Sequence, residues 1–380
     1  MRIPRPARPK RSRRLLASAA GAIALLTSAF AAAAFTGTVD APAAKGATAT
    51  PIQVYGAWLC GADECGWATA PDMTTFDTQN HWLIDRGNGQ PSVNLVSLAF
   101  VDPLKLLNST TDSGDTNGVP NGMTSAVVNY FTSHNVRVML SIGGQTYTSD
   151  WDTALSQNPT QLGLDAAALA KQLGVGIEID YENSASPKLT ALQSFITAYR
   201  SQEPYDATGA NPAARLTIDL AAGDQYLTAL ARYATTNWLD PSNPVLDYAN
   251  AMVANRQLST SSQESQWDEH ITGMPNYAPP VPPLAPAKMT GSVYITGSQV
   301  QPECNDFANS LESSTGSWVQ TIAPAGAGTT PGLLGYMFWA AGQPGTHTTN
   351  TFPPDSCQAG VGAGATAYSI PVPMPALRQS

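Results

Sequence analysis

Short apolar runs alternate with longer amphipathic stretches from residue 52 almost to the C-terminus. Eight of the runs are typical of buried β-strands, namely Ile52–Trp58, Val93–Val101, Val136–Ile142, Val175–Glu182, Leu216–Ala221, Val245–Val253, Ser292–Ile295 and Leu333–Trp339. The stretches between them that are typical of helices include Ser125–Ser133, Asp165–Leu173, Leu189–Arg200, Gln225–Tyr233 and Phe307–Ile322. Eight strands separated by helices over about 290 residues predict an α/β protein, a (β/α)8 TIM barrel formed as a single domain. A doubly wound open sheet is the alternative, but Gly61-Ala62-Asp63 after the first strand lacks the glycine-rich phosphate turn typical of that fold.

The N-terminus combines a basic segment with an apolar one. Seven of the nineteen Lys and Arg residues lie in the first fourteen positions, and an Ala/Leu-rich run from Leu15 to Phe35 follows them. This pattern predicts a secretory signal peptide over residues 1–34, of the Sec or the twin-arginine type, and therefore a secreted protein. A membrane anchor is the alternative because the run is near the length that spans a bilayer. The four alanines at 31–34 offer cleavage sites and favour removal.

The rest of the chain divides into a linker, a barrel and a tail. We expect a flexible linker over 35–50, the barrel over 51–345 and a C-terminal tail over 346–380. In an exported protein an even number of cysteines suggests disulfides, and the four are Cys60, Cys65, Cys304 and Cys357. Three pairings are open; a local Cys60–Cys65 bridge would leave the other two to tether the tail. The cysteines and histidines have no metal-ligand spacing, so we expect no metal and no other cofactor.

The charge balance limits the partners. Beyond the basic N-terminal segment, 28 acidic residues outnumber 12 basic ones. Such a surface is unsuited to nucleic acid or, after signal removal, to an anionic membrane, because phosphate binding needs cations. A neutral substrate is easier to accept, and we expect the protein to act as a monomer.

The segment from Gly174 to Asn183 contains the strongest chemical signal. Side chains in a strand alternate between its two faces, so Glu178, Asp180 and Glu182 share one face. In a barrel that face points inward, where crowding of like charges forces at least one carboxyl group to keep a proton. A protonated carboxyl group at the mouth of a barrel is suited to general acid catalysis. A solvated edge strand is the alternative interpretation of the same pattern.

These residues resemble the signature strand of family 18 glycoside hydrolases, the chitinase family, whose pattern is Asp-Gly-x-Asp-x-Asp-x-Glu on the fourth barrel strand. Here the five positions of the pattern are occupied by Val175, Gly176, Glu178, Asp180 and Glu182. A second family motif, Ser-x-Gly-Gly at the end of the third strand, is met by Ser141–Gly144. Further similarity follows in order along the chain, at Leu98–Phe100, Asp247–Met252 and Met337–Trp339.

The resemblance implies a retaining, substrate-assisted hydrolysis of β-1,4-linked N-acetylglucosamine. It implies that Glu182 is the general acid, that Asp180 orients the acetamide of the sugar, and that Glu178 shares a proton with Asp180. Sugar contacts are expected from a group of surrounding residues, namely Trp339, Met252, Asn255, Phe100, Gly144 and Tyr181.

Three positions depart from the family pattern. Val175 and Glu178 each replace an Asp, and Ala254 stands where the sixth strand of the family has a Tyr that donates to the acetamide. We considered Tyr55 and Tyr181 as substitutes for this donor, whose loss can cost about a hundredfold in rate.

The short connection from Ile295 to Pro331 indicates that the α+β insertion of many chitinases is absent, which favours an open groove and internal cleavage. That groove suits a chitin-like polymer, and equally an N-glycan cut by an endo-β-N-acetylglucosaminidase. A carbohydrate-binding homologue without turnover is the alternative from another class. Ser-His-Asp chemistry is a distant third because no His follows a suitable nucleophile turn.

Overall fold

The computed structural model describes residues 53–59, 67–85, 89, 91, 93–223, 225–252, 260–294 and 333–341. All of them belong to one compact unit that spans residues 47–380. Several expectations concern residues outside these ranges: the signal peptide, the linker, the tail, the four cysteines, the helix over 307–322 and the connection between the seventh and eighth strands. Within the described ranges, no helix combines the length and apolar character needed to cross a membrane.

Eight parallel strands form a closed barrel in the order β1-β10-β9-β8-β7-β6-β5-β2, and the α/β prediction of a (β/α)8 barrel is confirmed. The strands are β1 Val54–Leu59, β2 Leu95–Val101, β5 Arg137–Gly143, β6 Gly176–Asp180, β7 Leu216–Leu220, β8 Ala249–Ala251, β9 Met289–Tyr294 and β10 Gly335–Ala341. The ring closes because β1 pairs with β2 on one side and with β10 on the other.

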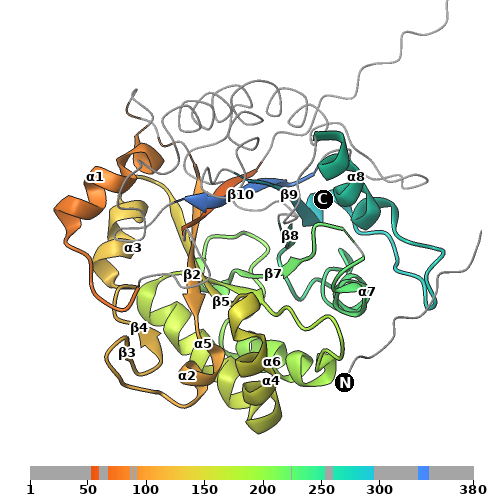
Figure 1. Ribbon diagram of the computed structural model, residues 1–380, viewed down its shortest axis with the longest axis horizontal. Helices are drawn as coiled ribbons and strands as arrows, with labels where there is room; N and C mark the ends of the chain where they lie inside the picture. Colours follow the sequence, from red (N-terminus) through yellow and green to blue (C-terminus); the bar gives the residue numbers. More distant parts are fainter. Residues whose placement is uncertain are drawn as a thin grey trace, which may run out of the picture. The chain divides into compact units, whose positions relative to one another are not determined.

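Helices lie outside the strands, with α1 and α3 on one side and α7 and α8 on the other (Figure 1). Their bounds are α1 Met73–Ile84, α2 Pro103–Leu107, α3 Ser125–Thr132, α4 Thr148–Gln157, α5 Pro159–Leu173, α6 Leu189–Gln202, α7 Thr228–Asn237 and α8 Thr260–Thr272. Short 3-10 turns occur at η1 Gln145–Tyr147, η2 Pro212–Ala214 and η3 Pro286–Lys288. A two-stranded hairpin, β3 Asp115–Thr116 with β4 Val119–Pro120, follows α2.

Local sequence signals fix the ends of several helices. Helix α5 starts after Asn158, whose Oδ1 accepts from the backbone N–H of Gln161 at 3.0 Å, and has Pro159 in its first turn. It ends at Gly174, which adopts the left-handed conformation with φ 69°. Helix α2 starts in the same way, with Asp102 accepting from the amides of its first turn.

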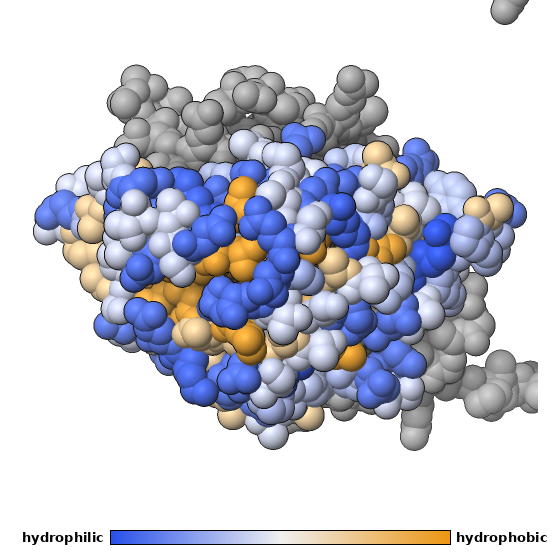
Figure 2. Space-filling model, turned by 90° about the horizontal axis from the view of Figure 1, so that it is seen from below, coloured by the Kyte–Doolittle hydropathy of each residue, from blue (hydrophilic) through white to orange (hydrophobic). Residues whose placement is uncertain are grey.

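Apolar and polar side chains both fill the barrel interior. The apolar ones form a cluster of residues from around the ring, namely Val54, Trp58, Leu95, Met139, Tyr248 and Met337. Outward-facing residues such as Ile177 and Ile179 join the large core between the strands and the helices. On the face shown in Figure 2, apolar patches lie among hydrophilic side chains.

Two predicted strands are shorter in the structure. The predicted strand 175–182 ends at Asp180, so Glu182 lies beyond it. The predicted strand 245–253 is reduced to Ala249–Ala251, because the amides of Val245 and Leu246 donate to the carbonyl of Trp238 instead of to a neighbouring strand.

Candidate active site

Three acidic side chains of increasing exposure lie along β6 and just beyond its end. Glu178 is completely buried and Asp180 is 4% exposed. Glu182, two residues past the end of the strand, is half-buried. The three carboxyl groups therefore form a series that leads from the barrel interior toward solvent, as expected for a strand whose alternate residues face inward.

Hydrogen bonds from across the barrel hold the Glu178 carboxylate. Oε1 accepts from the indole Nε1 of Trp58 at 2.8 Å and from the hydroxyl of Ser97 at 3.0 Å. Oε2 accepts from the side-chain N–H of Asn250 at 2.7 Å. Oδ1 of the same Asn250 accepts from the Thr290 hydroxyl at 2.7 Å. Because these donors lie on β1, β2 and β8, the Glu178 side chain points into the barrel.

Asp219 on β7 is a fourth carboxyl group that the sequence analysis missed. It is buried, and burial together with the nearby charges of Glu178 and Asp180 raises its pKa well above the usual value. Burial also raises the pKa of Glu178, but the Trp58 and Ser97 donors act in the opposite direction. Burial and like charges thus favour the neutral form of Asp219, which adds a carboxyl group to the Glu178–Asp180 pair expected to share a proton.

Tyr226, in the loop between β7 and α7, lies at the outer end of the acidic series. Its hydroxyl donates to the backbone carbonyl of Glu182 at 3.1 Å. Partial burial and the negative charges of Glu182 and Asp180 raise the pKa of Tyr226. Among the described residues its ring is an exposed large hydrophobic group, at 40%.

An aromatic cluster adjoins the acidic series. The Trp339 ring stacks on Phe100 with centroids 5.9 Å apart and planes 24° apart. It also lies 6.2 Å from the ring of Trp58, the donor to Glu178. Gly144, with φ 89°, passes beneath Phe100, and a Cβ at this position would come within 2.9 Å of the ring. Trp339, Phe100 and Gly144 are thus brought together with the carboxyl groups.

Three other predicted sugar-contacting residues have different positions. The Tyr181 side chain is completely buried and packs against Trp151 on α4, so it faces away from the barrel interior and its expected sugar contact is wrong. Its position follows from the alternation of the strand, which puts it opposite Glu178 and Asp180. Met252 is half-buried just after β8 and packs against the outer core. Asn255, like Ala254, lies outside the described residues.

Neither tyrosine considered as a substitute donor can reach the carboxyl groups. Tyr55 is completely buried in the same outer core, and the Tyr181 hydroxyl is bonded to Asp152 on α4. Tyr226 is the tyrosine that lies beside Glu182, and no sequence motif marked it.

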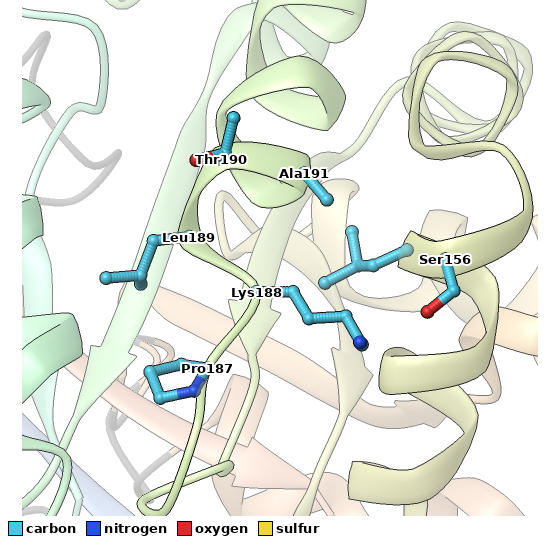
Figure 3. A pocket seen from close by; sticks show the side chains of 7 residues that line it. Ser156, Pro187, Lys188, Leu189, Thr190 and Ala191 are labelled. Atoms are coloured by element: carbon cyan, nitrogen blue, oxygen red, sulfur yellow. The ribbon is translucent and has the colours of Figure 1, made fainter.

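A separate hollow lies on the outside of the barrel, between α4 and the start of α6. Its lining residues are Leu155, Ser156, Pro187, Lys188, Leu189, Thr190 and Ala191 (Figure 3). No carboxyl group or aromatic ring lines it, so it has neither an acid nor a stacking surface. Within the described ranges, no three His, Cys, Asp or Glu side chains are placed to hold a metal ion.

Sequence comparison finds no protein-family model that matches this chain and no similar curated protein. Comparison of structures does find similar proteins. A family 18 chitinase from Pseudoalteromonas aurantia superposes with a TM-score of 0.53 at 14% identity, covering 82% of this chain and 98% of that one. A chitinase from Bacteroides thetaiotaomicron has a TM-score of 0.47 at 15% identity, covering 82% and 96%. A family 18 chitinase from Cycas revoluta, in complex with allosamidin, has a TM-score of 0.46 at 13% identity, covering 82% and 99%. The match to the Pseudoalteromonas aurantia chitinase shows that the chain has a fold like that of family 18 glycoside hydrolases, as the motifs predicted.

Proposed function

We propose that this protein is a glycosidase that cleaves β-1,4-linked N-acetylglucosamine within chitin-like polymers. The observation that supports this most directly is the acidic series on β6, which ends in the half-buried Glu182 beside Tyr226 and has the Trp339–Phe100 cluster nearby. A fold like that of family 18 chitinases supports the same reaction class.

In this proposal Glu182 protonates the glycosidic oxygen as the bond to the leaving sugar breaks. The acetamide oxygen of the sugar attacks the anomeric carbon, and water later opens the resulting ring, so the configuration is retained. Asp180, deeper in the barrel, orients the acetamide and stabilises its positive charge. A proton held by Asp219 would lower the negative charge around Asp180.

Trp339 provides an apolar face for a sugar ring. Its contacts with Phe100 and Trp58 fix the orientation of the indole, so little rotamer entropy is lost when a sugar binds.

The proposal is tested by Glu182→Gln, assayed on chitin oligosaccharides and a fluorogenic chitobioside. We expect kcat to fall at least about a hundredfold, since general acid catalysis contributes that much or more. Asp165→Asn, on the outer helix α5, is the matched control and should leave turnover unchanged. Equal turnover in Glu182→Gln and the native protein would disprove the role of Glu182. Binding of chitin oligomers by the native protein without new reducing ends would instead indicate a lectin.

Product analysis also separates the two substrates that an open groove suits. Soluble oligosaccharides released from chitin support the chitin-like polymer, whereas release of an N-glycan from a high-mannose glycoprotein would identify an endo-β-N-acetylglucosaminidase. We further propose that the enzyme acts outside the cell as a monomer after loss of residues 1–34. The mass of the exported chain and its sedimentation in solution test both points.

A further inference from the structure

The sheet does not hold Glu182. On one side the last register pair of β6 is Asp180 with Gly143 of β5, and on the other it is Ile179 with Ile218 of β7. Residues 181–183 therefore lie past the barrel ladder, where other contacts must fix the backbone.

Helix α4 supplies the first of these contacts, at the end of the strand. The indole Nε1 of Trp151 donates to the carbonyl of Asp180 at 3.0 Å, and the amide of Gly144 donates to the same oxygen at 3.0 Å. Gly143 makes room for this arrangement, because a Cβ there would overlap both the Asp180 carbonyl and the Trp151 nitrogen. The first glycine of the Ser-x-Gly-Gly motif thus allows α4 to approach the last residue of β6.

The next residue of α4 holds the chain on both sides of Glu182. Oδ1 of Asp152 accepts from the Tyr181 hydroxyl at 2.5 Å, and Oδ2 accepts from the Asn183 side-chain amide at 2.8 Å. Both bonds involve a carboxylate, and such bonds are stronger than those between neutral groups. We call Asp152, Tyr181 and Asn183 the Asp152 clamp.

Further hydrogen bonds limit movement of the clamp. The Tyr181 hydroxyl accepts from the backbone N–H of Lys188 at 3.0 Å, which fixes the far end of the loop. Oδ1 of Asn183 accepts from the amides of Ala185 and Ser186 at 3.0 and 2.9 Å. Because the Tyr181 ring is completely buried against Trp151, the clamp joins the segment around Glu182 to the packed core.

We propose that the Asp152 clamp positions Glu182, so that Asp152 is a positioning residue for proton transfer although it does not touch the substrate. This inference rests on the proposed role of Glu182 as general acid. The immediate neighbours of Glu182 in the chain are both bonded to one carboxylate, so loss of that carboxylate removes their shared support without altering the acid. A displacement of about 1 Å can cost about a hundredfold in a reaction that depends on alignment.

The test compares two chitobiosides that differ in their leaving groups. A dinitrophenolate leaves without help from an acid, whereas a sugar or methylumbelliferone benefits from protonation. In Asp152→Ala we expect kcat to fall at least tenfold on the poor leaving group and less than about twofold on the dinitrophenyl substrate, with KM changed less than twofold. Asp152→Asn, which keeps one acceptor, should show a smaller loss. Asp150→Ala, which removes another carboxylate from α4, should leave both rates unchanged. Equal losses on both substrates would indicate a merely structural role and overturn the proposal.

Tyr181→Phe provides a second variant that keeps the buried ring and removes only the hydroxyl, so it should fold. It should reproduce the leaving-group dependence of Asp152→Ala. Amide hydrogen exchange adds a readout that does not depend on turnover: in both variants, residues 181–188 should exchange at least tenfold faster while α6 stays protected. Unchanged exchange there would refute the clamp even if no substrate is turned over. Loss of activity in Glu182→Gln with full activity in Asp152→Ala would refute the clamp and leave the proposed function intact.

Discussion

The indole of Trp58 donates a 2.8 Å hydrogen bond to the Glu178 carboxylate inside the barrel. It links the first strand of the chain to the acidic strand. Together with Ser97 and Asn250 it stabilises the ionised form of Glu178, whereas burial opposes ionisation. The pKa of Asp219 is raised further than that of Glu178, because Asp219 is buried and faces the charges of both Glu178 and Asp180. The charge inside the barrel thus depends on how protons are distributed among Glu178, Asp180 and Asp219.

The raised pKa of Asp219 predicts a specific dependence of stability on pH. Since its pKa is raised on folding, its contribution to stability is fully present below about pH 4, the value for an unperturbed Asp, and is lost as pH rises through the folded pKa. Asp219→Asn imitates the neutral acid and cannot lose a proton. We therefore expect the free energy of unfolding of the variant, relative to the native protein, to increase between pH 5 and pH 8. Urea unfolding at both pH values measures this difference.

Asp240 gives a control in which the pH dependence of the free energy of unfolding has the opposite sign. The Ser242 amide and hydroxyl lower the pKa of this exposed carboxyl group, so it stabilises the fold when ionised. Asp240→Asn should lose stability relative to the native protein above about pH 4 and not below it. If Asp219→Asn follows the same course as Asp240→Asn, the proton is not on Asp219.

Trp339 is expected to dominate sugar affinity. Trp339→Ala removes the ring that stacks on Phe100 and should weaken binding of chitin oligomers by about 1–2 kcal/mol, roughly fivefold to thirtyfold. Trp339→Phe should recover part of the loss because a smaller ring keeps some stacking surface. Titration calorimetry in the Glu182→Gln background avoids turnover during the measurement. Affinity unchanged in Trp339→Ala would place the sugar elsewhere.

Tyr226 supports Glu182 from the loop between β7 and α7. Tyr226→Phe removes the hydroxyl that donates to the Glu182 carbonyl, and loss of one such bond costs about 1 kcal/mol. We expect kcat on chitobiosides to fall about threefold to tenfold, with little change in thermal stability because the ring is partly exposed. Tyr233→Phe is the control and should retain full turnover. Tyr233 lies on α7 and packs on Trp238, the residue that follows this helix. A full rate in Tyr226→Phe would contradict this role.

The sequence predicted the fold best where apolar, strand-like runs recur along the chain. All eight predicted strands exist, because a buried parallel strand produces a continuous apolar run that is hard to mistake for a loop. Helices α1, α2, α4 and α8 are not among the helical stretches named from the sequence; α2 is only five residues long, and in the others the core-facing residues are spread among polar ones. In α4 only Trp151, Ala154 and Leu155 are buried.

The candidate site was predicted where strand alternation or a sequence motif marks its residues. Alternation along β6 places Glu178 and Asp180 inside, and the same rule applied to Leu216–Leu220 would have identified Asp219. Asp152 and Tyr226 could not be predicted in this way, because their roles depend on which helix and which loop lie next to Glu182. That information comes from tertiary packing between segments far apart in the chain.

The pairing of β1 with β10 has a consequence for synthesis of the protein on the ribosome. Strand β1 is translated first among the barrel strands and β10 last. One edge of β1 therefore stays uncovered, and the ring cannot close, until nearly the whole domain has been translated. Until then β1 presents unpaired amides and carbonyls to other nascent chains. Chaperones that shield this edge are expected to improve the yield of soluble protein more than those that act on isolated helices.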